Sequence, residues 1–391
     1  YEQRFGRLEV RSSGPDGTED ADKLESFQFR RDRGWKVFHR RRVLRERNWE
    51  QGKCTSTNVL RAHDGAVTCL RLRWVSASRQ SAEESLVPPI PVLITGSEDG
   101  SIKVWRLDTS ECVSTLHGHS ASVQGLWFDD TMLVSGGMDG FVKLWDWREG
   151  RCTQTMLPND GEAGDAMEAE ETGKGVLCLD VEGKTLVSGG EDGLLRVWDI
   201  DAQSSLALGP TIAVAPGVPR PTVNAVKMWR GRGKVGMSAS STRSVGGVHE
   251  QRAFAAYSNG VVSLWDLQHR NVLRVFTGHL AMVTSLAVTR GNRPLIISGS
   301  LDSSIRIYDA SSGSWLRTNF FHTELVSALE ADGRYIVSGS HDRTITVCDR
   351  QWNAVARLVG HKEEIYCLGM DADKIVSGGG DGEVRVWSFA D

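Results

Sequence analysis

The sequence predicts an all-β fold, a seven-bladed β-propeller preceded by a short N-terminal helical segment. One phrase, an apolar run, two small residues, an Asp or Asn and a second apolar run, occurs at residues 93–105, 133–145, 186–198, 253–265, 296–308, 336–348 and 375–387. Five copies place Asp-Gly or Asn-Gly between the two runs, a strong signal of a tight β-hairpin. Four strand-like runs per repeat, at a spacing of roughly 40 residues, are typical of propeller blades.

Two further runs complete each repeat. An inner strand is expected before the hairpin, as at residues 67–72, 123–128, 223–228, 283–288 and 365–370. An outer strand ending near Gly-His is expected after it, as at residues 112–119, 272–279 and 355–361. The last repeat stops without an outer strand, and Thr57–His63 has the outer-strand pattern ahead of the first repeat. We therefore expect residues 57–63 to close the ring, because an unpaired strand edge promotes aggregation.

The sequence divides into three parts. Residues 1–29 are polar and irregular and are predicted to be disordered. Residues 30–55 form a basic helical linker, with Trp35, Phe38 and Trp49 as expected packing anchors. Residues 56–391 form the propeller, interrupted by predicted loops at 74–91, 149–175 and 229–252. The first residue is Tyr1 instead of Met, which indicates a fragment of a longer protein.

The composition favours an intracellular protein, cytoplasmic or nuclear, without nucleic-acid or membrane partners. The net charge of -4 and the pI near 6.2 give no general attraction for nucleic acid or anionic lipid. No apolar run is long enough to span a bilayer, and no signal-peptide pattern begins the sequence. The seven cysteines are widely spaced without a C-x-x-C pair, so reduced buried thiols are expected.

Three repeats combine a His, a Ser or Thr, an Asp and a Trp at matching positions: His63, Thr95, Asp99 and Trp105; His119, Ser135, Asp139 and Trp145; His361, Ser377, Asp381 and Trp387. A hydrolase triad is the alternative interpretation. Three copies in one chain cannot all be active sites, and a hydrogen-bond chain from Trp through Ser and His to Asp would satisfy these groups inside a blade. We expect a structural network, with no catalytic residue, metal or cofactor.

With these motifs the chain resembles the seven-bladed WD-repeat propellers over residues 57–388. Four repeats depart from the family pattern and should form looser blades. The third lacks the His, and the fourth has Ala255 and Asn259 in place of Ser and Asp. The fifth and sixth end in Tyr308 and Cys348 instead of Trp.

Residues 34–54, GWKVFHRRRVLRERNWEQGKC, are similar to the linker that follows the F-box in F-box/WD-repeat proteins. The F-box itself is not recognisable in residues 1–30. The resemblance implies a noncatalytic substrate-recognition subunit of a cullin-RING ubiquitin ligase, attached to its adaptor through an upstream F-box. The alternatives are a basic helix docked under any propeller, and a WD-repeat scaffold that organises a complex unrelated to ubiquitin.

The resemblance also implies a partner-binding face, formed by two positions per blade. The first is the second residue of each inner strand: Thr68, Gln124, Leu177, Asn224, Thr284, Ser327 and Tyr366. The second is the residue before each turn Asp or Asn: Glu98, Met138, Glu191, Ser258, Leu301, His341 and Gly380. None is Arg or Lys, and phosphate recognition usually needs such a cation, which only His341 with Arg343 offers. Glu98, Glu191 and the acidic segment 158–171 favour a neutral or basic protein ligand over a phosphorylated one.

Overall fold

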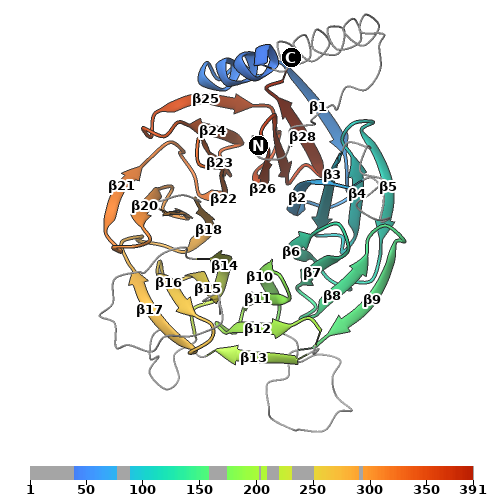
Figure 1. The fold of residues 1–391 in the computed structure, drawn as a ribbon, viewed down its shortest axis with the longest axis vertical. Helices are drawn as coiled ribbons and strands as arrows, with labels where there is room; N and C mark the ends of the chain where they lie inside the picture. Colours follow the sequence, from blue (N-terminus) through green and yellow to red (C-terminus); the bar gives the residue numbers. More distant parts are fainter. Residues whose placement is uncertain are drawn as a thin grey trace, which may run out of the picture.

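Seven four-stranded antiparallel sheets form a closed ring around a central axis (Figure 1). The computed structural model describes residues 39–76, 89–157, 174–201, 204–208, 220–230, 251–289 and 294–390. The predicted disordered segment 1–29, the acidic segment 158–171, and the anchors Trp35 and Phe38 lie outside these residues. The seven-bladed propeller expected from the repeats is confirmed.

The first four blades follow chain order from the inner to the outer strand. Blade 1 contains β2 (Val67–Val75), β3 (Ile90–Ser97), β4 (Ile102–Arg106) and β5 (Glu111–Leu116). Blade 2 contains β6 (Val123–Phe128), β7 (Leu133–Gly137), β8 (Val142–Asp146) and β9 (Arg151–Met156). Blade 3 contains β10 (Val176–Glu182), β11 (Thr185–Gly190), β12 (Leu195–Asp199) and β13 (Ser204–Leu208). Blade 4 contains β14 (Val223–Arg230), β15 (Gln251–Tyr257), β16 (Val262–Asp266) and β17 (Asn271–Phe276).

The last three blades include the one that joins the two ends of the ring. Blade 5 contains β18 (Val283–Val288), β19 (Leu295–Ser300), β20 (Ile305–Asp309) and β21 (Trp315–Asn319). Blade 6 contains β22 (Val326–Ala331), β23 (Ile336–Ser340), β24 (Thr344–Cys348) and β25 (Ala354–Val359). Blade 7 contains β26 (Ile365–Met370), β27 (Lys374–Gly379), β28 (Glu383–Ser388) and, on its outer edge, β1 (Ser56–Arg61).

The outer strand of blade 7 comes from the start of the propeller. β1 pairs antiparallel with β28 from Ser56 opposite Ser388 to Arg61 opposite Glu383. Leu60 of β1 is buried in the same apolar cluster as Val376 of blade 7 and Val67 of blade 1. The pairing thus covers the edge of β28 and links blades 7 and 1 through a shared core.

The apolar core lies mainly between neighbouring blades. One buried cluster joins Val92 and Ile94 of blade 1 to Phe128 and Trp145 of blade 2, and six comparable clusters involve the other neighbouring blades. Each sheet therefore has both faces covered, as its runs of buried residues require. The stability of each blade depends on its two neighbours.

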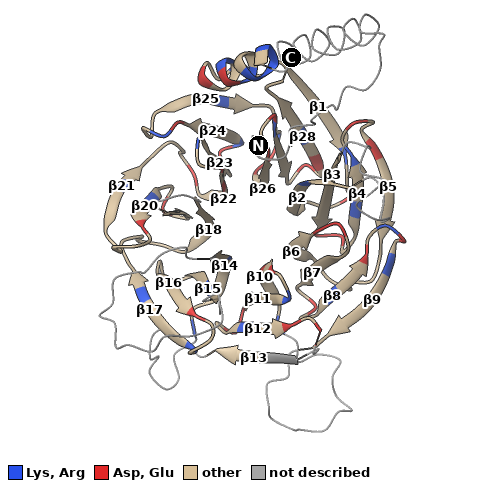
Figure 2. Ribbon diagram, in the orientation of Figure 1, with Lys and Arg blue, Asp and Glu red and all other residues tan. Residues whose placement is uncertain are grey.

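A helix of residues 39–50 packs against blades 6 and 7 at the rim of the ring (Figure 1). Trp49 is 3% exposed and stacks on Phe389 and Tyr335, with ring centroids 4.0 Å and 4.8 Å apart. Its indole Nε1 donates to the Ala372 carbonyl at 3.1 Å. Arg45 pairs with Asp373 at 2.6 Å, among the charges that Figure 2 marks on the helix and nearby loops.

Because these contacts involve the β22–β23 and β26–β27 loops, the helix lies at the opposite strand ends from the turns that carry Glu98 and His341. The helix therefore leaves those turns uncovered.

Candidate functional site

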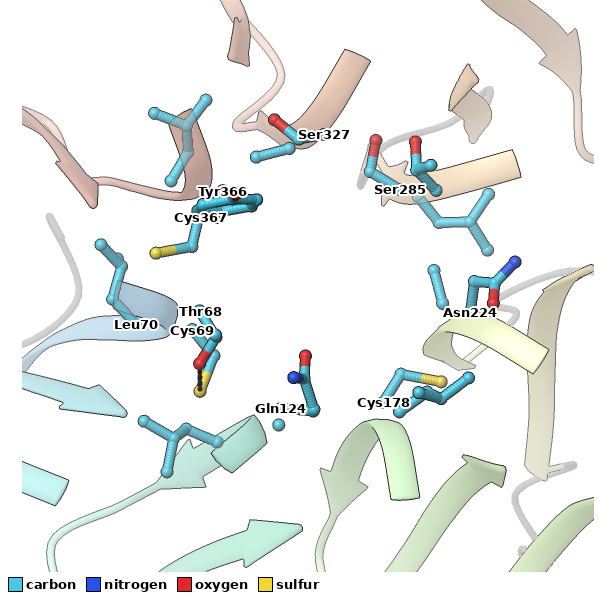
Figure 3. A pocket seen from close by; sticks show the side chains of 18 of the residues that line it. Thr68, Cys69, Leu70, Gln124, Cys178, Asn224, Ser285, Ser327, Tyr366 and Cys367 are labelled. Atoms are coloured by element: carbon cyan, nitrogen blue, oxygen red, sulfur yellow. Dashed lines mark hydrogen bonds between the residues drawn. The ribbon is translucent and has the colours of Figure 1, made fainter. Parts of the chain in front are cut away.

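All seven inner-strand positions predicted to face a partner line one cavity on the ring axis. The cavity has a volume of about 690 Å³ and includes the residues Thr68, Gln124, Leu177, Asn224, Thr284, Ser327 and Tyr366. Figure 3 shows labelled side chains from all seven blades around it. We call this set of seven residues the inner ring.

A β-bulge at every inner strand explains why these side chains share one direction. In each blade the register between the first two strands shifts across one residue, as between Val67 and Cys69 or between Ile365 and Cys367. The residue skipped is the inner-ring residue. A bulge leaves one residue outside the ladder and redirects its side chain, here toward the axis. The sequence pattern indicated these positions but not the bulge that orients them.

Several inner-ring side chains are engaged in bonds between blades. Thr68, Thr284 and Ser327 each donate through a hydroxyl to the carbonyl of the first inner-strand residue in the next blade. Asn224 Nδ2 does the same to Val283 at 3.2 Å. Such bonds satisfy buried carbonyls, so these four positions hold the ring together as well as lining the cavity.

Buried thiols make the same inter-blade connection. Cys178 and Cys367 donate to the carbonyls of Val223 and Val67 at 3.4 Å and 3.3 Å. Cys69 shares the Val123 carbonyl with Thr68, its sulfur lying at 3.3 Å. Burial raises the pKa of Cys69 and of Cys178 to about 12, which keeps both thiols protonated as donors. These cysteines are structural elements of the ring.

Of the predicted turn positions, Glu98, Met138 and His341 line the cavity. Glu191, Ser258, Leu301, Gly380 and Arg343 are not among the lining residues. Two of these have other engagements, since the Glu191 carboxylate accepts from Gly175 N at 3.2 Å and the Ser258 hydroxyl accepts from Thr222 N at 3.0 Å. Leu301 is 46% exposed beside the cavity, and Arg343 lies exposed in its turn. The turn set therefore splits into cavity-lining and peripheral positions.

His341 and Tyr366 form the aromatic part of the cavity mouth. Their rings lie 5.1 Å apart at 83°, an edge-to-face contact. Burial lowers the pKa of His341, which leaves it neutral near pH 7. Of the two cations predicted for this site, only Arg343 therefore carries charge, which weakens the case for phosphate recognition.

Deeper in the cavity an ion cluster crosses the axis. Arg71 Nη1 and Lys227 Nζ lie 3.1 Å and 3.5 Å from the same oxygen of Glu330. The three residues are the fifth of β2, β14 and β22, in blades 1, 4 and 6, so their side chains meet across the ring. No motif in the sequence predicted this cluster. Comparing the fifth residue of each inner strand, where charges of both signs occur, would have been the signal.

The predicted hydrogen-bond networks lie inside the blades. In blade 2, His119 Nε2 lies 2.7 Å from Ser135 Oγ and its Nδ1 lies 2.8 Å from Asp139, while Trp145 Nε1 donates to Ser135 at 2.8 Å. Blade 7 repeats this with His361, Ser377, Asp381 and Trp387 at 2.8 to 3.2 Å. In blade 1, Trp105 Nε1 donates to Thr95 Oγ1 at 3.1 Å, and His63 Nε2 lies 2.8 Å from the same oxygen. His63 Nδ1 lies 3.4 Å from Asp99.

Two repeats that lack the Trp nevertheless keep the rest of the network. His279 joins Ser298 at 2.8 Å and Asp302 at 3.0 Å in blade 5. His322 joins Ser338 at 2.8 Å and Asp342 at 3.0 Å in blade 6. Five blades therefore contain a buried His, Ser or Thr, Asp set, a repetition that fits structural bonding and not catalysis.

Blades 3 and 4 replace the network with other bonds. Arg196 pairs with Asp192 at 2.6 Å in blade 3, where the sequence lacks the His, and Trp198 still donates to Ser188 at 2.8 Å. In blade 4, where Ala255 replaces the Ser, Trp265 donates instead to the Tyr257 hydroxyl at 3.2 Å. Each departure in sequence is accompanied by a different partner for the buried polar group.

Burial and hydrogen bonding set the charge states within these networks. Burial lowers the pKa of His63, His279, His322 and His361, which favours neutral imidazole. Burial alone would raise the pKa of Asp302, but hydrogen bonds from Ser304, Leu280 N and His279 lower it to about 2. An ionised Asp accepting from a neutral His fixes the proton on Nδ1, so Nε2 accepts from the Ser hydroxyl. Within the described residues no group of three His, Cys, Asp or Glu side chains is arranged to hold a metal.

The sequence comparisons agree with this architecture. The family described as "WD domain, G-beta repeat" matches residues 52–106, 110–146, 168–199, 270–309, 313–349 and 352–388, together more than half of the chain. The chain belongs to the WD-repeat family. Most of blade 4 falls outside the matched residues, where Ala255 and Asn259 depart from the pattern. WD-repeat propellers are generally noncatalytic protein-interaction modules, which is the coarse function that the match supports.

The relatives that match this WD-repeat chain carry names that refer to different processes. It is 25% identical over 310 residues to a ribosome biogenesis protein WDR12 homolog of Anopheles gambiae, covering 75% of this chain and 68% of the relative. It is 26% identical over 370 residues to mitochondrial division protein 1 of Chaetomium globosum, covering 85% and 53%. A U3 snoRNP-associated protein-like EMB2271 of Arabidopsis thaliana is 29% identical over 131 residues, covering 33% and 27%. The chain thus spans only about half or less of several relatives, and an F-box family is not among these matches.

No helix within the described WD-repeat chain has the length and apolar character needed to cross a membrane.

Proposed function

We propose that this WD-repeat chain is a noncatalytic platform that organises a multiprotein complex, with the cavity mouth as its principal binding surface. The observation that carries the proposal is the convergence of the seven inner-ring residues with Glu98, Met138 and His341 on a single cavity. Side chains from every blade can then contact one partner, while the buried polar networks account for the Ser, His and Asp residues without catalysis. We place its action inside the cell, in the nucleus, the cytoplasm or both.

The partner is proposed to be a protein or peptide that is neutral or basic. Glu98 lies at the mouth, His341 is uncharged near pH 7, and Arg343 lies outside the cavity lining. A phosphorylated ligand would find no guanidinium fork among the lining residues of the mouth. The relatives' names refer to ribosome biogenesis, a U3 snoRNP and mitochondrial division, so they support roles in several assemblies without selecting one.

A substrate receptor of a cullin-RING ubiquitin ligase is the second candidate. It is motivated by residues 34–54, whose described part is a basic helix fixed to blades 6 and 7 by Trp49 and Arg45. Because this helix lies away from the cavity mouth, an upstream adaptor-binding segment and a substrate could be held together.

Quantitative co-purification from cells tests the platform and separates the two candidates. Tyr366→Ala should reduce recovery of the principal partner without lowering the unfolding temperature, and Glu191→Lys should do so more weakly because Glu191 lies outside the cavity lining. Val113→Ser, an exposed outer-strand substitution, is the matched control. Unchanged partner recovery with Tyr366→Ala contradicts the platform proposal. Cullin subunits bound to the full-length protein would favour the receptor, and their absence would exclude it.

A further inference from the structure

The cavity mouth beside blade 7 combines aromatic rings with carboxylates. Tyr366 packs edge-to-face with His341 at 5.1 Å. Burial and the nearby Glu364, Glu98 and Glu363 raise the pKa of the Tyr366 phenol, which places three glutamates around that ring. Glu324 and Glu364 likewise act on His341. We call Glu98, His341, Glu363, Glu364 and Tyr366 the acidic corner.

The side chains of Glu363 and Tyr366 lie close together beside Gly380. A Cβ at that position would lie 3.0 Å from a Glu363 carboxylate oxygen and 3.3 Å from Cε2 of Tyr366. The ring edge and the carboxylate therefore converge above a residue that has no side chain. Lys362 and Arg343 lie on the same side of the ring and are both exposed, so they offset this negative charge only in part.

The ion cluster below limits what can enter. Arg71 and Lys227 already share the Glu330 carboxylate across the axis. These residues lie three positions beyond the inner ring, a depth of about 10 Å at the rise of a β-strand. A ligand that enters from the mouth therefore has room for one side chain above the ion cluster. The Glu330 carboxylate below is already paired and does not attract a further cation.

An apolar shelf continues the mouth onto blade 5. Leu280 is 91% exposed and Leu301 is 46% exposed. The backbone of Leu301 is bonded to Met282 at 2.9 Å, and Met282 and Leu325 both line the cavity. An apolar contact surface thus extends along the mouth from blade 5 to the acidic corner on blades 6, 7 and 1.

We propose that the acidic corner binds an arginine or lysine side chain of a partner protein, and that the apolar shelf binds a neighbouring apolar residue of the same segment. A cation beside Tyr366 would gain both a carboxylate partner and a cation–π contact, which is favourable within about 6 Å of a ring. This inference rests on the proposed function and specifies its partner chemistry.

An array of twelve-residue peptides tests it with the full chain. The probes carry one Leu and one Arg separated by zero to six residues in a Gly/Ser background, with matched sets bearing Gln or Glu for Arg and Ser for Leu. The strongest Leu and Arg peptide is then measured by fluorescence anisotropy against purified variants. Glu363→Gln with Glu364→Gln should weaken binding by about tenfold, since hydrogen bonds to charged groups are roughly twice as strong as neutral ones and the variant removes two carboxylate charges.

Two further variants address the geometry. Gly380→Ala should weaken binding by filling the convergence point, and Leu301→Ser should remove the preference for Leu. A double substitution of acids at the outer rim, Glu111→Gln in β5 with Glu149→Gln in the β8–β9 turn, changes the net charge equally and should leave the Kd unchanged.

Each outcome decides the proposal. Preference for Arg that is lost in the acidic-corner variants and retained in the outer-rim control supports it. Equal or stronger binding of the Glu peptides, with sensitivity to Tyr366→Ala, overturns the partner chemistry while leaving the platform function intact. Failure of every peptide to bind also overturns this inference, whereas the platform is judged independently by partner recovery with Tyr366→Ala.

Discussion

Replacing Ser135 by Ala tests the structural interpretation of the buried networks. Ser135 is fully buried, lies 2.7 Å from His119 Nε2 and accepts from Trp145 Nε1 at 2.8 Å. Removing its Oγ leaves two buried groups without this partner, the indole N–H and the imidazole Nε2. An unsatisfied buried polar group costs about 1 to 3 kcal/mol, so we expect the free energy of unfolding to fall by about 3 kcal/mol.

The chain contains its own matched control in blade 6. Ser338 makes the same 2.8 Å bond to His322, but Cys348 stands where Trp145 stands in blade 2. Ser338→Ala therefore leaves one strongly bonded polar group without its partner instead of two. We expect its cost to be about half, near 1.5 kcal/mol.

Urea unfolding followed by tryptophan fluorescence measures both variants against the parent chain. The informative quantity is the difference in unfolding free energy at a common urea concentration within the transition. A loss below about 0.5 kcal/mol for Ser135→Ala, the range of ordinary surface substitutions, would refute the reasoning. Equal losses for Ser135→Ala and Ser338→Ala would refute the role assigned to the Trp145 donor.

Three other changes have defined outcomes. Burial lowers the folded-state pKa of four histidines, His63, His279, His322 and His361. The unfolded chain therefore binds more protons than the folded chain below pH 6.5, and stability falls as the pH is lowered. The urea concentration at the midpoint of unfolding should decrease from pH 7.5 to pH 5.5. The carboxylate of Asp302, with its pKa of about 2, contributes stability that is lost only below about pH 4, so it does not affect this range. A urea midpoint that stays constant between pH 7.5 and pH 5.5 would therefore contradict neutral buried histidines. Trp49→Ala should lower the unfolding free energy by about 3 kcal/mol through lost stacking on Phe389 and Tyr335, whereas the exposed Val43→Ala should change it by less than about 0.5 kcal/mol. Deleting residues 1–63 removes β1 and should cause aggregation detectable by light scattering, whereas deleting residues 1–38 should not; a stable monomer of residues 64–391 would disprove the need for this closing strand.

The repeats and their hairpins were predictable because their causes are local. Asp139-Gly140 specifies its turn through two adjacent residues, and Gly140 indeed has φ of 81°. The bond between Ser135 and Trp145 joins residues ten apart on paired strands, so a fixed spacing indicates it. For the same reason the resemblance of a repeat to its neighbours was enough to find most of the buried polar sets.

Other features depend on which residues meet after the ring closes. Arg71 and Glu330 are 259 positions apart, and the sequence around each residue contains no motif that predicts their contact. The departures at Tyr308 and Cys348 suggested weaker blades, but the His, Ser and Asp bonds of blades 5 and 6 do not require a Trp. The substitute partners, Arg196 as a donor to Asp192 and the Tyr257 hydroxyl as an acceptor from Trp265, were likewise visible only once their strands were paired.

The sequence by itself determined the number of blades, the turns and the outer strand that returns to blade 7, and its family resemblance indicated two positions per blade on one face of the ring. These follow from a period repeated along the chain and from backbone preferences of two to thirteen neighbouring residues. Only the tertiary structure decided which turn residues reach the cavity, which side chains bond between blades, and that Arg71 and Lys227 share Glu330 beneath the acidic corner. Those outcomes depend on distances across the ring, which the order of residues along the chain does not encode locally.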